Sequence, residues 1–337
     1  MAVDVSNALL CWYVVDKRRL PWRPAEGQRL DAYRVWLSEV MLQQTTVAHA
    51  RPYFEKFVRR WPTVARLAEA EDGDVMAAWA GLGYYARARN LLACARKVVI
   101  DHSGDFPDEE AELRKLPGIG DYTAAAIAAI AFGRRALVMD TNVARVVARL
   151  HGVEAPISES KRRLRQFLDR MTPNKDAGDF AQAMMDLGAT ICRPRAPGCD
   201  ACPLNSDCAA YASGEPGRFP APKQKTARPV RHGIAYWSER NGCVWLVRRP
   251  AKGMLGGMAA LPGPDWTDEP IRVAPPLGHI THVFTHFRLE LAIVSAPVAP
   301  SSEGWWQPVA KLDEAGLPSL YKRAAESVLA SRNALAA

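Results

Sequence analysis

The run LPGIG at residues 116–120 is the feature that most limits how this chain can fold, because it stands between an amphipathic segment and an alanine-rich segment at 123–131. High helix propensity on both sides of a Pro-Gly turn predicts a helix, a tight turn and a second helix. Glycine tolerates positive φ and leaves the backbone uncovered, so Gly118 and Gly120 allow amide N–H groups at the start of the second helix to point at an anion. Such a turn holds a nucleic-acid backbone without reading its sequence, although a turn that binds nothing explains the same letters.

Asp140 follows the second predicted helix and opens a third one at 143–150. Aspartate is a preferred N-cap residue, so a purely structural role is one interpretation of this position. Asp140 also lies a short distance downstream of the Gly-rich turn, so a turn suited to a phosphate is followed by a carboxylate.

Glu39 is the second carboxylate of interest, and it belongs to a helical segment predicted at 31–49. Val35, Trp36 and Leu42 lie one turn away from it, so it projects from a largely apolar surface. Burial there disfavours the charged form, so we expect the pKa of Glu39 to rise and the group to hold a proton near neutral pH. A side chain tilted to solvent at the edge of the core is the alternative.

Two runs combine aromatic and basic residues, one before Glu39 and one between Glu39 and Asp140. Residues 81–90, GLGYYARARN, place tyrosines between glycines and arginines, which is typical of a loop that offers an apolar wedge to a base step and cations to phosphates. Residues 20–23, LPWR, put Trp22 and Arg23 beside a proline turn. The simpler interpretation of the tyrosines is that they pack in the core. The simpler interpretation of LPWR is that it anchors a loop.

Four cysteines form a group with the spacing C-x6-C-x2-C-x5-C, in a segment rich in proline, glycine and aspartate: Cys192, Cys199, Cys202 and Cys208. A short polar loop has to wrap around something to be ordered. Four thiolates can ligate one tetrahedral zinc ion or a cubane iron–sulfur cluster, and chemistry alone leaves both open. The remaining cysteines, Cys11, Cys94 and Cys243, are isolated and predicted to be ordinary thiols.

The 337 residues carry a net charge of +8 with a pI of about 9.2, which favours a polyanionic partner. No run of 18 apolar residues and no basic-then-apolar N-terminal order is present, so we expect a cytoplasmic protein without a membrane span. Composition and predicted secondary structure divide the chain into a helical domain at 1–212, a Pro-rich basic linker at 213–230 and an α+β domain at 231–337. Strands are predicted at 234–237, 243–248 and 289–295, helices at 176–191 and 318–333.

These motifs together resemble the helix-hairpin-helix DNA glycosylases of the endonuclease III superfamily, and within it the MutY family of adenine glycosylases. The resemblance is carried by WLSEVMLQQT at 36–45, the run at 81–90, the hairpin, Asp140 with Asn142, MMDLG at 184–188, the cysteine spacing and FTH at 284–286. It implies a mostly α glycosylase domain with a [4Fe-4S] loop at 192–208, where Arg193 and Arg195 touch DNA. It also implies a C-terminal MutT-like (Nudix-fold) domain that recognises rather than hydrolyses, because the acidic Nudix signature is absent.

The resemblance also assigns roles to individual residues. The catalytic group is Glu39, Asp140, Tyr122 and Asn142. The adenine pocket is Leu20, Trp22, Arg23 and Gln182. The DNA-binding group is Gln44, Thr45, Leu82, Tyr84, Gly118, Gly120, Phe284, Thr285 and His286.

The activity implied by this family is excision of adenine mispaired with 8-oxoguanine or guanine in double-stranded DNA, after the adenine has been extruded from the stack. Protonated Glu39 would donate to the base while ionised Asp140 stabilises the sugar cation. Tyr122 stands where bifunctional relatives carry the lysine that Schiff-base chemistry requires, so we expect little lyase activity.

Two departures and two alternatives accompany the assignment. Thr285 replaces the serine of the family's Phe-Ser-His loop, and residues 258–261 lack its larger side chains. The alternatives are another glycosylase of the superfamily, acting on T:G mispairs or oxidised pyrimidines, and a non-catalytic module that only binds lesions. A clamp around one duplex needs no symmetry mate, so we expect a monomer, and the sequence identifies no sliding-clamp or mismatch-repair partner.

Overall fold

The computed structural model describes residues 5–23, 31–222, 227–250, 253–273, 276–296 and 303–336. Residues 223–226 of the predicted linker therefore lie outside the described residues. Contacts divide the chain into two compact units, one made of Met1–Glu69 and Ala93–Lys225, the other of Ala70–Leu92 and Thr226–Ala337. The second unit thus takes in a segment that the sequence analysis placed inside the helical domain, and the domain ends at 212 and 231 remain predictions.

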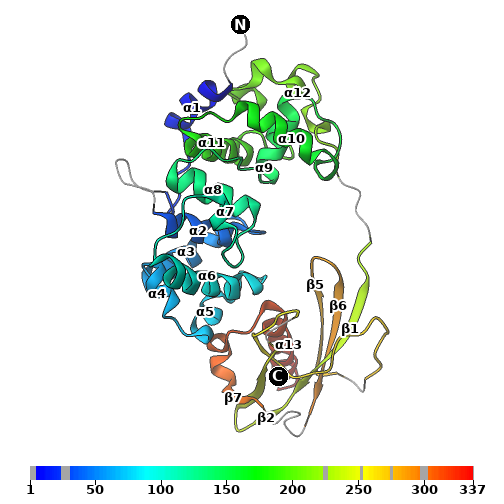
Figure 1. The fold of residues 1–337 in the computed structure, drawn as a ribbon. Coiled ribbons are helices and arrows are strands. Elements are labelled where there is room, and N and C mark those ends of the chain that lie inside the picture. The colour runs from blue at the N-terminus through cyan, green and yellow to red at the C-terminus, as the bar shows by residue number, and fades with distance from the viewer. Residues whose placement is uncertain are drawn as a thin grey trace. The chain divides into compact units, whose positions relative to one another are not determined.

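The first unit is helical, and Figure 1 shows its elements. Its helices are α1 (Val5–Asp16), α2 (Ala32–Leu42), α3 (Val47–Arg60), α4 (Val64–Ala68), α7 (Glu110–Leu113), α8 (Asp121–Phe132), α9 (Thr141–Leu150), α10 (Ile157–Met171), α11 (Ala177–Thr190) and α12 (Ala209–Ala212). Two further helices, α5 (Asp72–Trp79) and the start of α6 (Ala86–His102), belong to the second unit.

Helix α8 is the centre of the first unit, as its alanine content predicts. Residues 123–130 are all buried, and α8 packs against both α2 and α11. The approach to α11 is close, because a Cβ atom at Gly178 would lie 2.4 Å from the carbonyl oxygen of Ala129. Small side chains on α8 and a glycine on α11 therefore bring together the helices that carry Tyr122 and Gln182.

The predicted helix at 31–49 is wrong, because the structure interrupts it at residues 43–46. Gln44 has a φ of 61°, which lies outside the helical range, and the side chain of Thr46 then caps α3 by accepting from the backbone N–H of His49. The segment at 81–90 is a loop only up to Tyr85, since α6 begins at Ala86. Both differences depend on single backbone conformations rather than on hydrophobic periodicity.

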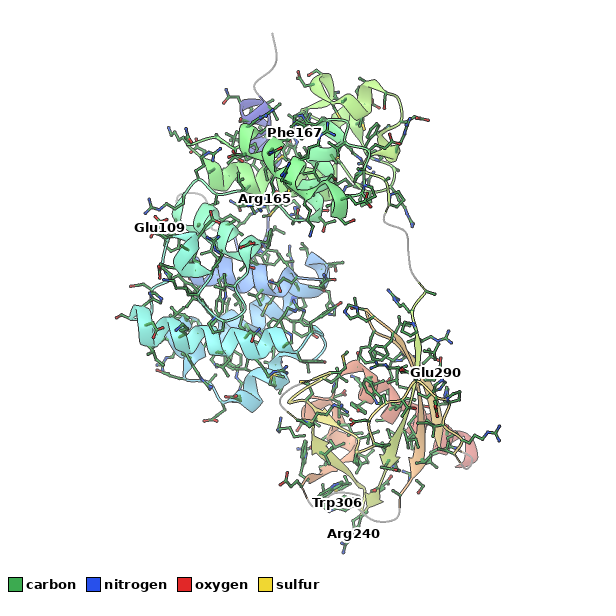
Figure 2. All side chains as sticks on the ribbon, turned by 45° about the vertical axis from the view of Figure 1, so that its right-hand side comes forward. Glu109, Arg165, Phe167, Arg240, Glu290 and Trp306 are labelled. Carbon is green, nitrogen blue, oxygen red and sulfur yellow. The ribbon has the colours of Figure 1, made fainter. Side chains whose placement is uncertain are left out.

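Helix α10 was not predicted, since charged residues dominate its sequence. Its core contacts come from Leu164, Leu168 and Met171, whereas Arg165, labelled in Figure 2, is exposed. Phe167, labelled in the same view, stacks on His151 with ring centroids 4.0 Å apart.

The second unit is built on strands, and Figure 1 shows them. They are β1 (Val230–Trp237), β2 (Glu239–Arg240), β3 (Cys243–Arg248), β4 (Ala259–Ala260), β5 (Gly278–Val283), β6 (Arg288–Ser295) and β7 (Trp305–Pro308). One sheet has the order β1-β6-β5, in which β1 runs parallel to β6 and β5 antiparallel to it. In the other sheet β3 pairs antiparallel with β2, β4 and β7.

The core of the second unit lies between these strands and the terminal helix α13 (Ser319–Ala336). Leu289, Leu291 and Ile293 alternate along β6 and are completely buried, together with Leu320 of α13. An α+β fold was predicted for this part of the chain, and it is confirmed. Across the described helices of both units, none combines the length and apolar character needed to cross a membrane.

Candidate active site

Glu39 lies in α2, whose start is fixed by the side chain of Asp31 accepting from the N–H of Tyr33. Its side chain belongs to the buried face of the helix and is only 7% exposed. Burial raises the pKa of Glu39 to about 7, although a hydrogen bond from Tyr122 opposes the shift. The carboxyl group therefore exchanges its proton near neutral pH, which suits a general acid.

Tyr122 stands in the first turn of α8 and donates from its hydroxyl to Oε2 of Glu39 over 2.7 Å. Burial raises the pKa of this phenol well above its ordinary value, and the charge of Glu39 acts in the same direction. The hydroxyl therefore stays protonated and acts as a donor. It holds one oxygen of Glu39 in place and leaves the other oxygen able to carry a proton.

Asp140 is the N-cap residue of α9, as the sequence allowed. Its Oδ1 accepts from the N–H of Val143 at 2.7 Å, and the Nδ2 of Asn142 lies 3.3 Å from its Oδ2. Burial raises the pKa of Asp140, while these hydrogen bonds and the charge of Arg145 act against the rise. N–H donors and a helix N-terminus favour the carboxylate form, so Asp140 keeps a charge that Glu39 loses.

The two carboxyl groups influence each other although about 100 residues separate them in the chain. The charge of Asp140 raises the pKa of Glu39, and both groups act on Tyr122. When the pair takes up one proton, Glu39 is the group that receives it, because only Asp140 has backbone donors. The arrangement supplies an acid and an anion, and the charge of the anion acts on the acid.

Arg145 was missed by the sequence analysis, and it connects this site to the cysteine loop. Its Nη2 donates to Oδ1 of Asn142 and to the carbonyl of Gly188, both over 2.8 Å, while its Nε donates to the carbonyl of Cys192 over 2.9 Å. The available signal was the pair of arginines, Arg145 and Arg149, among the apolar residues of α9, because a buried cation requires partners.

The predicted pocket residues belong to the first unit, where Arg23 contacts α11, the helix that also carries Gln182. Trp22 is buried with its ring edge against Phe54, and Arg23 pairs with the buried Asp186. The charge of Arg23 lowers the pKa of Glu39, which places its guanidinium in the electrostatic neighbourhood of the acid. Gln182 is buried on α11, where its amide lies 3.4 Å from the carbonyl of Gly178, and Leu20 is half-buried.

The hairpin between α7 and α8 has the predicted order, with one difference. Gly118 has a φ of 76°, whereas Gly120 has an ordinary φ of −96° and is the N-cap residue of α8. A Cβ atom at Gly120 would meet nothing within 4 Å, so its amide end of the helix lies open. Gln44 and Thr45, also predicted to bind DNA, form the turn after α2, where Gln44 is exposed.

In the second unit, Tyr84 and Thr285 meet. Their hydroxyl oxygens lie 2.6 Å apart in a hydrogen bond, and the tyrosine side chain is 48% exposed with a φ of 48°. Thr285 and His286 stand in the turn between β5 and β6, while Phe284 packs on the core through Phe287. Leu82 is 5% exposed, so it contributes to packing rather than to this surface.

The four clustered cysteines line one cavity, together with Arg149 and Tyr211. All four are free thiols, and each of the other three raises the pKa of Cys202 in addition to burial. Within the described residues, no three acidic, histidine or cysteine side chains converge closely enough to hold a single metal ion. Four cysteine side chains around one cavity could hold a metal centre, and both a zinc ion and an iron–sulfur cluster use such a set of donors.

Arg149 of α9 is only 3% exposed and forms hydrogen bonds with the cysteine loop. It donates to Sγ of Cys192 over 3.3 Å and to the carbonyls of Arg193 and Pro194. A cation beside sulfur stabilises thiolates, which are the form that binds iron. Arg193 bonds the carbonyl of Ala196 through its side chain, and Arg195 is exposed on the loop.

Comparison with known proteins gives two family matches. Residues 37–173 match the HhH-GPD superfamily of base excision DNA repair proteins, and residues 233–327 match the NUDIX domain. An adenine DNA glycosylase of Mycobacterium tuberculosis is 40% identical over 68% of this chain and 72% of that protein. The human and Arabidopsis thaliana adenine DNA glycosylases are 35% and 38% identical over 84% and 77% of this chain.

The chain spans 65% of the human protein's length and 47% of the Arabidopsis protein's length. Among solved structures, a thermostable thymine-DNA glycosylase is 29% identical with a TM-score of 0.55, and it covers 62% of this chain and 95% of its own. The HhH-GPD match at residues 37–173 includes both carboxylates, Glu39 and Asp140, and the hairpin at Gly118.

Proposed function

Because the chain belongs to the adenine DNA glycosylase family of the HhH-GPD superfamily, we propose that it excises adenine mispaired with 8-oxoguanine or guanine in duplex DNA. The observation that carries the proposal is the buried Glu39, whose pKa of about 7 and bond to Tyr122 suit proton donation beside the charge of Asp140. The alternative of a module that only binds lesions offers no reason for such a pair.

In the proposed reaction, an extruded adenine receives the proton of Glu39 at N7. The bond between N9 and C1′ then breaks, and its electron pair leaves with the base. Asp140 stabilises the positive charge that develops on the sugar, and a water molecule adds its oxygen to C1′ while a carboxylate takes up the released proton. The products are free adenine and an abasic site.

Tyr122 argues for hydrolysis without strand cleavage. An enzyme that forms a Schiff base with the sugar needs an amine, whereas the phenol of Tyr122 is buried and already donates to Glu39. We therefore expect a monofunctional glycosylase.

DNA contact is proposed for three surfaces on the two units. The open N-terminus of α8 offers backbone N–H groups to phosphates, the turn at Gln44 and Thr45 lies just after the helix of Glu39, and Tyr84 offers an exposed ring as a wedge. Thr285 keeps the hydroxyl that this family directs at 8-oxoguanine. Its added methyl group makes the preference for 8-oxoguanine over guanine a property to measure.

We also propose that the four cysteines hold a [4Fe-4S] cluster, as relatives of this family generally do. The residues fit that group, because their sulfurs line one cavity and Arg149 stands beside Cys192. The cluster would brace the loop that carries Arg193 and Arg195. Aerobically purified protein should then be yellow-brown and contain four iron atoms per chain, whereas stoichiometric zinc would contradict the assignment.

Base-release assays test the activity. Duplexes that contain adenine opposite 8-oxoguanine, adenine opposite guanine, thymine opposite guanine, or thymine glycol separate this proposal from the other glycosylases. Release of a pyrimidine without adenine, as the thymine-DNA glycosylase likeness would allow, rejects it.

Two variants test the carboxylates themselves. Glu39→Gln should lower single-turnover adenine release by roughly 10²–10⁴, the usual contribution of a general acid. Asp140→Asn should keep the N-cap bond to Val143 and lose the charge, so release should fall while helix α9 stays intact. Unchanged product yields in both variants would mean that neither group is catalytic.

A further inference from the structure

The carboxylate of Asp186 is completely buried in α11, and two arginines bind it. Arg23 donates from Nη1 to Oδ2 over 2.7 Å and from Nη2 to Oδ1 over 2.9 Å. Arg18 donates from its backbone N–H to Oδ2 over 3.0 Å and from Nε to Oδ1 over 2.6 Å. Burial raises the pKa of Asp186, but these bonds and charges outweigh it, so the net pKa lies below the ordinary value.

The same contacts fix the orientation of Arg23. Besides its two bonds to Asp186, its Nη1 donates to the carbonyl of Arg18 over 3.0 Å, and its guanidinium lies 5.5 Å from the ring centre of Tyr13. The side chain is only 11% exposed. Because a guanidinium binds a carboxylate as a planar fork, loss of Asp186 would leave this cation without the partner that defines its plane.

Arg23 in turn acts on the proposed acid. The groups that act on Glu39 are Tyr122 from α8, Asp140 from the start of α9, and Arg23, whose charge favours the carboxylate form. The charged groups that act on Asp186 are Arg18 and Arg23, and those that act on Tyr13 also include Asp179. Asp179 in turn has Lys17 and Asp176 as charged neighbours. A cation in this neighbourhood that lacked a counter-charge would drive the proton off Glu39.

We propose that Asp186 is a positioning residue for adenine excision, which holds Arg23 beside the site and neutralises it so that Glu39 keeps its proton near neutral pH. The inference rests on the proposed role of Glu39 as general acid. It explains why a family pocket residue, Arg23, can line the site of an acid without abolishing its function. It also gives the buried carboxylate in the MMDLG motif a task beyond packing.

Charge-removing variants should shift the titration of Glu39 in opposite directions. Asp186→Asn keeps the shape and removes the counter-charge, so the midpoint should move to lower pH by roughly one unit. Arg23→Gln removes the cation, so the midpoint should move to higher pH. Arg18→Gln is the matched control, because it removes a partner of Asp186 and leaves both bonds from Arg23, so the midpoint should stay.

Two measurements report that midpoint in the full-length protein. Single-turnover adenine release against pH gives it through activity. Carbon-13 NMR of protein labelled at the glutamate carboxyl carbon gives it directly, and Glu39→Gln identifies the signal. Thermal unfolding at each pH verifies that every variant is folded.

The outcomes separate the two levels of inference. A folded Asp186→Asn protein whose release falls equally at all pH values, with an unmoved NMR midpoint, overturns the proposal. If Asp186→Asn does not fold, Arg23→Gln decides alone, and an unmoved midpoint again overturns it. Opposite NMR shifts in a protein that releases no adenine would support the positioning role and reject the proposed function.

Discussion

At the residue scale, folding and chemistry make opposite demands on the carboxyl group of Glu39. Burial on α2 disfavours its charge, and that same burial brings its pKa to about 7. A proton donor must be protonated, so adenine release should be fastest below pH 7 and should fall about tenfold per pH unit above it. Single-turnover rates measured from pH 5 to pH 9 test this. A rate that rises through this range would assign the decisive group as a base.

The raised pKa also predicts a stability effect. A carboxyl whose folded pKa is about 7 and whose unfolded pKa is 4.5 contributes most to stability below pH 4.5, and this contribution is lost as pH rises through 7. At pH 8 the buried charge thus costs about 3 kcal/mol. Glu39→Gln keeps an acceptor for Tyr122 and removes the charge, so it should raise the free energy of unfolding by up to that amount at pH 8 and by little near pH 4.

Denaturant unfolding at the two pH values measures this gain. Glu112→Gln is a suitable control, because Glu112 is on the surface and pairs with Lys115. An equal effect of Glu39→Gln at both pH values would show that the carboxyl is solvated rather than buried.

At the element scale, the two glycines of the turn between α7 and α8 serve different purposes, one for the backbone conformation and the other for access of a ligand to the helix N-terminus. Gly118 has a φ of 76°, so Gly118→Ala should destabilise the protein by about 1 kcal/mol. Gly120 has an ordinary φ and open space around its Cα, so Gly120→Ala should disturb the fold less but cover the amides of α8. Each variant should weaken DNA binding, and the loss of affinity should be the same for every DNA sequence, because the turn contacts phosphates. Fluorescence anisotropy and denaturant unfolding measure the two effects, and unchanged DNA affinity in both variants would reject the hairpin as a DNA contact.

Elements with a strong local pattern were predictable. The alternation at 243–248 coincides with β3, and the alanine-rich run gave α8, because propensity and burial agree there. Helix α10 was not predicted because only three buried apolar residues, Leu164, Leu168 and Met171, stand among many charged ones. The break after α2 depends on the positive φ of Gln44, and no glycine or proline beside Gln44 in the sequence indicates that conformation.

The site shows the same limit. Glu39, Tyr122 and Asp140 could be named from motifs, yet the bond between Tyr122 and Glu39 arises only from the packing of α8 against α2. Asp140 is placed by α9, which packs on α11 as α8 does. Arg145 and Arg149 carry no local signal beyond their unusual place on a buried helix face. Tertiary hydrogen bonds to Cys192, rather than sequence spacing, identify what they do.

At the scale of the whole molecule, the division into units crosses the predicted domain boundary. The segment Ala70–Leu92 finds its contacts with C-terminal residues, where Arg89 bonds the carbonyl of Gly256 and Tyr84 bonds Thr285. The proposed wedge and the proposed recognition turn therefore belong to one unit. The acid, its tyrosine and the aspartate belong entirely to the other unit. Chemistry and recognition of the opposite base are thus assigned to different parts of the chain.

Removal of residues 223–337 tests this division. The shortened chain keeps Glu39, Tyr122 and Asp140, so it should still release adenine from A:G duplexes, whereas its preference for 8-oxoguanine over guanine should fall. Loss of the bonds from Arg89 and Tyr84 should also increase hydrogen exchange across 70–92. Thr285→Val in the full chain is the matched control, because it removes one hydroxyl and should reduce the preference without the increased exchange around Arg89. A folded shortened chain that retains the full preference would place recognition of the opposite base in the helical unit, and one that releases no adenine would show that the second unit takes part in the chemistry.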